Sequence, residues 1–107
     1  MRVLLDNCVP WRLGGEIRGH EEVSSVIDLG WADLKNGALL DAMAGRFDAL
    51  VTVDRSVPYQ QRLHDRTFAV VLLRATSNRL VDLLPLVPAL LLALDEVKPG
   101  ELREIRA

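Results

Sequence analysis

Two aspartates, Asp6 and Asp54, each follow a short apolar run of the sequence. Asp6 comes after RVLL at residues 2–5, and Asp54 closes DALVTVD at residues 48–54. If both runs are neighbouring strands, the two carboxylates lie close together and repel unless a proton or a cation binds between them. Carboxylate oxygens suit Mg²⁺ or Mn²⁺. A metal held there would activate water for the hydrolysis of a phosphodiester.

A simpler interpretation of each aspartate competes with the metal site. An aspartate directly after a strand often only forms a turn or caps a helix. The sequence contains two such acids in a small α/β chain, without a Gly-rich phosphate loop or a Ser-His-Asp arrangement. On chemistry alone, the two interpretations therefore carry equal weight.

Strands and helices that would position these acids alternate along the chain. Apolar runs predict strands at 2–5, 22–27, 48–54 and 68–73, and a short edge strand at 101–105. Helices are predicted from Pro10 to Gly19, from Asn36 as the capping residue, from Ser56 towards His64, and from Arg79 to Glu96 with a break or kink at Pro85.

This alternation predicts a three-layer α/β/α fold with a mostly parallel central sheet of four to five strands and right-handed crossovers. A sheet wound in both directions places its first and third strands side by side. Ligands of such sheets bind beyond the carboxyl ends of the strands, where the winding direction reverses. Asp6 and Asp54 are both expected at that place.

Composition limits the class of protein. The chain has 107 residues, 50% of them hydrophobic, which suits one domain over residues 1–107 and is too little for two. A net charge of −2 means that nucleic-acid binding would need a local basic patch or bound metal ions. The single Cys8 excludes an intramolecular disulfide, and we expect a cytoplasmic protein. The apolar run 83–94 is shorter than the roughly 20 residues of a membrane span, so no membrane partner is expected.

Cations and aromatic residues supply candidate contacts to a substrate. Lys35, Arg55, Arg62 and Arg74 fall near predicted strand ends or on the helix after Asp54, and Trp31 and Tyr59 are available to stack on unpaired bases. A scatter of surface cations is an equally weighted alternative. Asn7 and Cys8 directly follow Asp6 and should border the pocket. We expect Cys8 to pack as a small buried hydrophobic residue. Trp11 is expected in the core.

Four segments carry a resemblance to a known family. VLLDNCVPWRL, GHEEV, DLGWADLKNGALL and FDALVTVDRSVP resemble the short PIN-like domains related to VapC-type toxin ribonucleases. The resemblance implies a PIN fold, a Mg²⁺ or Mn²⁺ site and cleavage of single-stranded RNA, often within a toxin and antitoxin pair. It implies Asp6 and Asp54 as catalytic metal ligands and Asn36 as an assisting group. Asn7, Lys35, Arg55 and Arg74 are the candidates for substrate binding.

The chain departs from the family pattern at two positions. Asn36 and Ser56 stand where the family usually has acids, and the loss of charge should lower the affinity for Mg²⁺. A catalytically silent module that binds RNA or protein is therefore the alternative function. A receiver domain with Asp54 as phosphate acceptor is a third hypothesis, but Lys98 precedes the final strand instead of following it. Excess leucine between Arg79 and Val97 suggests a homodimer, with an antitoxin as the other candidate partner.

Overall fold

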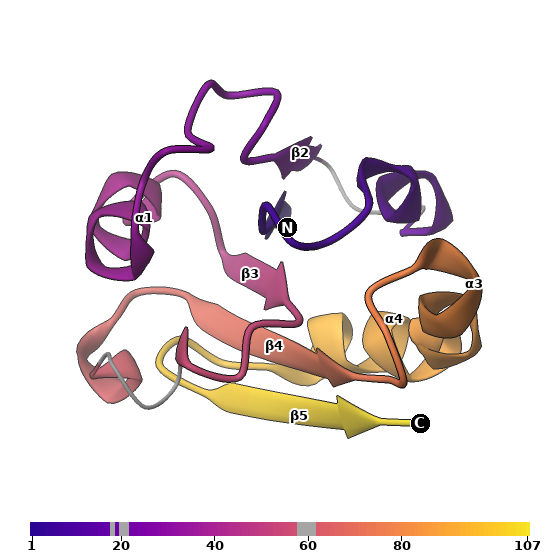
Figure 1. The fold of residues 1–107 in the computed structure, drawn as a ribbon. Coiled ribbons are helices and arrows are strands. Elements are labelled where there is room, and N and C mark those ends of the chain that lie inside the picture. The colour runs from indigo at the N-terminus through magenta and orange to yellow at the C-terminus, as the bar shows by residue number, and fades with distance from the viewer. Residues whose placement is uncertain (18, 20–21, 58–61) are drawn as a thin grey trace.

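The computed structural model describes residues 1–107 apart from 18, 20–21 and 58–61, and for Asn36 it describes the backbone alone. Five strands form one parallel sheet in the order β2-β1-β3-β4-β5 (Figure 1). They are β1 (Arg2–Leu5), β2 (Glu22–Ser25), β3 (Ala49–Thr52), β4 (Ala69–Arg74) and β5 (Leu102–Arg106). The predicted parallel α/β sheet is confirmed, and β1 and β3 are neighbours.

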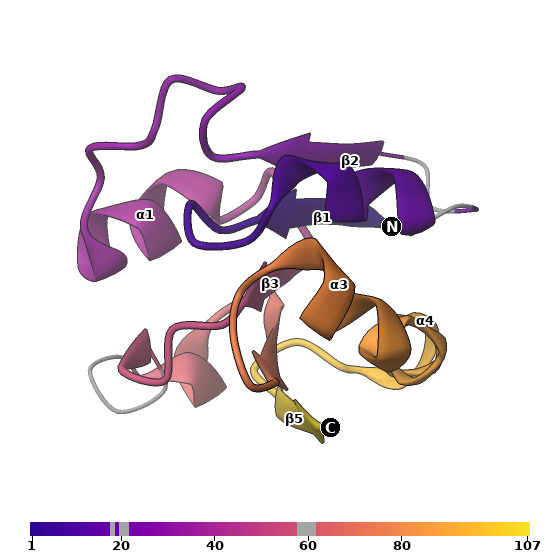
Figure 2. The ribbon, with the colours of Figure 1, turned by 45° about the vertical axis from the view of Figure 1, so that its right-hand side comes forward.

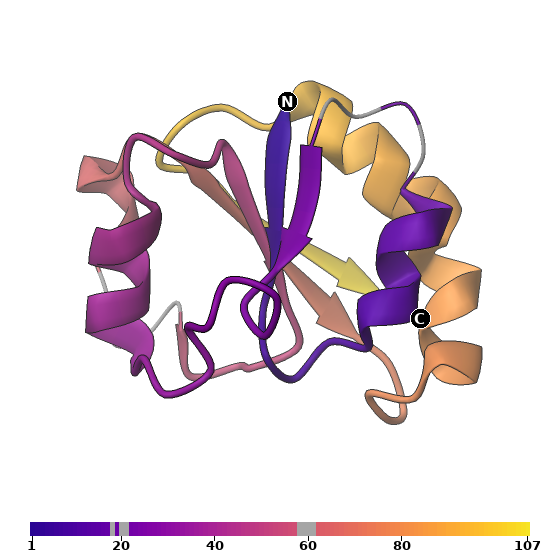
Figure 3. The ribbon, with the colours of Figure 1, turned by 90° about the horizontal axis from the view of Figure 1, so that it is seen from above.

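Helices cover both faces of this sheet, as the view from above in Figure 3 shows. One face carries α1 (Asn36–Met43) and the 3₁₀ helix η2 (Leu63–Asp65). The other face carries η1 (Trp11–Glu16), α3 (Leu80–Leu83), η3 (Leu84–Leu86) and α4 (Val87–Glu96). The last three elements follow one another beside η1 (Figure 2). The 3₁₀ turn around Pro85 is the predicted break in the helix.

Central strands are apolar on both sides because each face of the sheet meets a helix layer. Val3, Leu5 and Val51 point into the core beneath η1 and α4, while Leu4 and Leu50 point into the core beneath α1. All four residues of β3 are buried, including the polar Thr52. No helix of the described ranges is both long and apolar enough to cross a bilayer.

The connection from β4 to β5 has an unexpected hand. The step from β1 to β2 and the step from β4 to β5 proceed in opposite directions along the sheet, yet their helices lie over the same face. The two crossovers therefore have opposite hands, and Figure 3 shows the last one as left-handed. The expectation of right-handed crossovers throughout is wrong for this connection, which belongs to a class of about 2% of cases.

Packing accounts for this choice of face. The short η1 leaves Val71 and Leu73 of β4 uncovered, and Leu83, Leu90 and Leu94 fill that part of the same core. As a result, no helix of the described residues covers the α1 face of β5, and Leu102, Glu104 and Arg106 are exposed there.

Several sequence expectations need correction. Trp11 lies on the surface with 65% of its area exposed, because it is two residues from the buried Leu13 and such neighbours do not share a helix face. The cap of α1 is Lys35, and Asn36 is the first helical residue. β2 ends at Ser25, leaving Ile27 exposed. Of the helix expected from Ser56 towards His64, the structure describes Val57 as helical and the 3₁₀ turn η2 near His64, and residues 58–61 between them lie outside the described part.

Gly100 provides a test of the turn that leads into β5. Its φ is +84°, and a Cβ there would lie 2.9 Å from the backbone oxygen of His64. Gly45 has a similar φ of +78° with no atom within 4 Å of that position. Gly45→Ala should therefore cost only the left-handed strain of about 1–2 kcal/mol, and Gly100→Ala should cost clearly more in urea denaturation. Equal losses in the two variants would contradict the close approach.

Candidate active site

The carboxyl ends of β1 and β3 form the point where the winding direction of the sheet reverses. β2 lies on one side of β1, and β3, β4 and β5 follow on the other. The amide of Asp6 donates to the Val51 oxygen at 3.0 Å, which extends the β1–β3 pairing to this residue. Asp54 lies two residues beyond the end of β3. Both predicted acids therefore lie at the position where doubly wound sheets bind ligands.

The hydroxyl of Thr52 links the two acids. Its Oγ1 donates to Oδ2 of Asp6 at 2.6 Å and accepts the backbone N–H of Asp54 at 3.0 Å. Thr52 is fully buried and Asp6 is 8% exposed, so this contact is shielded from bulk water. The sequence pattern did not predict a role for Thr52 in the site. The sequence feature that could have indicated this role is a polar residue inside an otherwise apolar strand.

The remaining oxygens of the two acids differ in their surroundings. Oδ1 of Asp6 accepts the Asn7 amide at 2.7 Å. Oδ1 of Asp54 accepts both the amide and the hydroxyl of Ser56, at 2.9 and 2.6 Å. In the described part of the chain, Oδ2 of Asp54 accepts no hydrogen bond. This oxygen is available to an external cation or donor.

Cys8 lies in the field of both acids. Its Sγ is 3.6 Å from Oγ1 of Thr52 and 3.8 Å from Oδ2 of Asp6. Burial raises the pKa of the Cys8 thiol, and the charges of Asp6 and then Asp54 raise it further, against hydrogen bonds from Val53 and Thr52. Cys8 is therefore a half-buried thiol and not a thiolate nucleophile, in agreement with its expected packing role.

The donor set fits one kind of metal site. Within the described residues, no three His, Cys, Asp or Glu side chains gather as a complete protein cage for a metal. Mg²⁺ usually takes one or two carboxylates and completes its shell with water and substrate phosphates. Asp6 with Asp54 and its open oxygen fits that pattern. The side chain of Asn36 is not described, but α1 begins there, antiparallel to the strands and thus at their carboxyl edge.

A basic groove extends from this edge towards β5. We define it by Arg55, Arg74 and Arg106, which line a cavity of about 180 Å³ beside Ala75. A second cavity of about 170 Å³ shares Arg55 and Arg74 and reaches Asn78. Nδ2 of Asn78 donates to the backbone oxygen of Cys8 at 3.1 Å, which joins the groove to the loop that carries Asp6.

The groove keeps an excess of positive charge. Glu104 accepts Arg74 at 2.5 Å and Arg106 at 3.1 Å, so one carboxylate faces two guanidinium groups. Arg74 and Arg55 were predicted from the sequence as substrate contacts, whereas Arg106 was not. Its signal was the position of this arginine at the carboxyl end of the edge strand, in register with Arg74.

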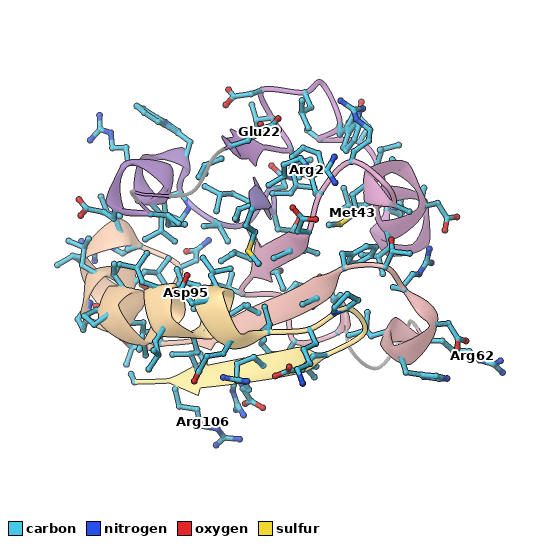
Figure 4. The ribbon with its side chains drawn as sticks, turned by 180° about the vertical axis from the view of Figure 1, so that it is seen from behind. Arg2, Glu22, Met43, Arg62, Asp95 and Arg106 are labelled. Carbon is cyan, nitrogen blue, oxygen red and sulfur yellow. The ribbon has the colours of Figure 1, made fainter. Side chains whose placement is uncertain are left out.

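Other predicted contacts lie elsewhere. Figure 4 shows Arg62 and Arg106 at opposite sides of the molecule, so Arg62 does not belong to the basic groove. Trp31 packs edge-on against Phe47 at 6.2 Å between ring centroids, and the Arg46 guanidinium lies 4.9 Å from its ring centre. Trp31 is thus a packing residue, contrary to its expected availability for stacking. Lys35 and Asn7 are exposed at the carboxyl edge, and Tyr59 lies outside the described residues.

Comparisons with known proteins add no relative: no family model, no curated protein and no solved structure matches this chain. The fold and the site alone define the class, a parallel α/β domain with two acids at its switch point. The strand order is shared with flavodoxin-like and receiver domains. However, Lys98 precedes β5 and so lies at the opposite edge of the sheet from Asp54, which removes the receiver arrangement.

Cys8 can report the charge of the neighbouring acid. Asp6→Asn removes that charge while an amide oxygen remains to accept the Thr52 proton. We expect the pKa of Cys8 to fall, because the negative field that opposes its thiolate is weaker. Alkylation by iodoacetamide at pH 8 should become several-fold faster. Asp65→Asn, beside His64 on η2, is the control for a remote charge. Equal rates in both variants would mean that Asp6 carries no charge near the thiol.

Proposed function

We propose that this protein is a PIN-like endoribonuclease that uses Mg²⁺ or Mn²⁺ to cleave single-stranded RNA. The observation that carries the proposal is the common attachment of Asp6 and Asp54 to the Thr52 hydroxyl at the switch point of the sheet. One hydroxyl thus binds the carboxylate of Asp6 and the backbone N–H of Asp54, and among the described residues no basic side chain pairs with either carboxylate. Such a pair favours a cation.

The residues of the chain divide the work at this site. Asp6 and Asp54 would hold the metal, and Asn36, the first residue of α1, would assist. Thr52 holds the carboxylate of Asp6, and Ser56 holds that of Asp54 through Oδ1, which leaves Oδ2 for the metal. A bound Mg²⁺ or Mn²⁺ supplies Lewis acidity, activating water and offsetting the charge that develops on the phosphodiester.

The basic groove suits the phosphates of a flexible strand. Arg55, Arg74 and Arg106 offer planar guanidinium groups that bind phosphate oxygens in pairs. Because the net charge of the chain is −2, binding of nucleic acid needs a local basic patch, and these arginines form one. Asn7 and Lys35, exposed at the same edge, are further proposed contacts to the substrate.

A silent binding module is the second candidate. One observation favours it: both oxygens of Asp6 already accept hydrogen bonds from the protein, and the amide and hydroxyl residues Asn36 and Ser56 bring no charge. In that case the basic groove still binds RNA, but no metal is held and no bond is cleaved.

Calorimetry with Mn²⁺, followed by cleavage of single-stranded RNA, tests the metal-dependent function. The wild type should bind Mn²⁺ saturably, and Asp6→Asn and Asp54→Asn should each remove this binding and lower cleavage by at least about a hundredfold. Asp65→Asn is the control and should behave as the wild type.

Two results would contradict parts of this proposal. Cleavage unchanged in both aspartate variants would exclude the metal site formed by these residues. RNA binding that persists in the wild type and both variants, without any cleavage, would instead support the binding module.

We propose a cytoplasmic protein that works with an antitoxin and forms a homodimer. An apolar stripe on the outer side of α3, η3 and α4 supports a second copy as partner, through Val81, Leu84 and Leu92, each exposed by 39% or more. Exposed Arg79 and Asp95 flank its two ends. An antiparallel two-fold pairing of the stripes brings these opposite charges together.

Light scattering after gel filtration tests the homodimer. The wild type should have about twice the monomer mass of 11.9 kDa, and Leu92→Gln should be a monomer because it places an amide in the apolar contact. Ile27→Gln alters a similarly exposed residue, 55% against 60%, outside the stripe and should remain dimeric. A monomeric wild type would exclude the homodimer.

A further inference from the structure

A cavity of about 220 Å³ lies between η1 and β2, on the other side of the two acids from the basic groove. Trp11, Gly14 and Gly15 line it from η1, and Ser24 and Asp28 line it from β2 and the following loop. Leu5 forms part of its wall and is the residue directly before Asp6. The cavity is smaller than the roughly 300–1,000 Å³ of sites for drug-sized ligands, so it suits a single ring system.

Trp11 gives this cavity an aromatic wall. The ring is 65% exposed and belongs to neither hydrophobic core, although tryptophan is usually well buried. Its described ring contact is with the guanidinium of Arg12, 5.4 Å from the ring centroid. An exposed indole beside a cavity is a stacking surface for a planar ligand.

Two glycines of η1 line the cavity, and their surroundings differ. Each weakens a helix by about 1 kcal/mol relative to alanine. A Cβ on Gly14 would approach Cγ1 of Val23 to 3.2 Å, so packing explains this glycine. A Cβ on Gly15 would meet nothing within 4 Å, and its φ is not in the left-handed region. Neither close packing nor backbone strain calls for glycine at position 15, but a larger side chain there would narrow the cavity.

Asp28 determines the chemistry that the cavity accepts. The backbone N–H of Asp28 donates to Oγ of Ser25 at 3.1 Å, which fixes the start of the loop. Its exposed carboxylate has no partner among the described residues. A free carboxylate accepts hydrogen bonds and repels phosphate. The matching ligand is therefore a neutral planar ring with adjacent N–H donors, and among the nucleobases guanine offers two such donors on one edge.

We propose that the cavity bounded by Trp11 and Asp28 binds one unpaired guanine base of the RNA substrate. This inference rests on the proposed function, since it assigns the cavity to the same strand of RNA. The acids lie between the base site and the basic groove. A strand crossing the carboxyl edge of the sheet thus has its phosphates on Arg55 and Arg74 while one base stacks on Trp11.

Fluorescence titration with the nucleoside guanosine, without metal, tests the base site separately from catalysis. Trp31→Phe leaves Trp11 as the single indole, and guanosine should quench it saturably, with uridine at least about tenfold weaker. Asp28→Asn should weaken guanosine binding at least about tenfold and bring it close to uridine. Asp33→Asn, an exposed acid in the same loop, is the matched control and should change nothing. Should Trp31→Phe fail to fold, calorimetry replaces fluorescence: guanosine should bind the wild type more tightly than uridine does, and Trp11→Ala should lose guanosine binding.

The outcomes separate the base site from the proposed function. Guanosine binding that is retained in Asp6→Asn, together with selective loss in Asp28→Asn, would support the base site whether or not RNA is cleaved. Absence of quenching, or equal binding of guanosine and uridine that Asp28→Asn leaves unchanged, would overturn it even if metal-dependent cleavage is found.

Discussion

The candidate site depends on the hydrogen bonds of the Thr52 hydroxyl. This hydroxyl lies inside a buried strand, where an unpaired hydroxyl would be costly, and besides its contact with Cys8 it donates to the Asp6 carboxylate and accepts the Asp54 backbone N–H. The position of Asp6 relative to Asp54 is therefore fixed by the pairing of β1 with β3 and not by a flexible loop. Asp6 is nearly buried, yet no arginine or lysine of the described residues pairs with it. A carboxylate without a basic partner is the kind of group that favours a cation, which is the basis of the proposed metal site.

Much of this arrangement follows from the sequence by simple rules. Apolar runs identified all five strands, and the two acids after them were expected at the carboxyl edge of neighbouring strands, where they lie. Pro85 marked the break between α3 and α4 correctly. These predictions succeed because they depend on the local pattern of residues and on the fixed geometry of parallel sheets.

Predictions that require knowledge of neighbours in space were less successful. Trp11 was assigned to the core by its place in an apolar segment, but a 3₁₀ helix turns it away from Leu13. The hand of the last crossover depends on the face of the sheet against which the leucines of α4 pack. They pack on the same face as η1, which is too short to cover that face alone. The roles of Arg106 and Thr52 depend on residues that are distant in the sequence: Arg106 lies beside Arg55 and Arg74, and Thr52 binds Asp6. Such contacts form only when the chain folds.

The left-handed crossover has a consequence for the behaviour of the protein in solution. β5 is an outer strand, and the described part of the chain leaves one of its backbone edges unpaired and one of its faces uncovered; such strands readily join other chains. Arg103, Glu104 and Arg106 place alternating charges along this edge, with Glu104 tied to Arg74. Charged side chains discourage edge-to-edge association. The residues that give the basic groove its charge therefore also guard the sheet against aggregation, and selection for either property constrains the other.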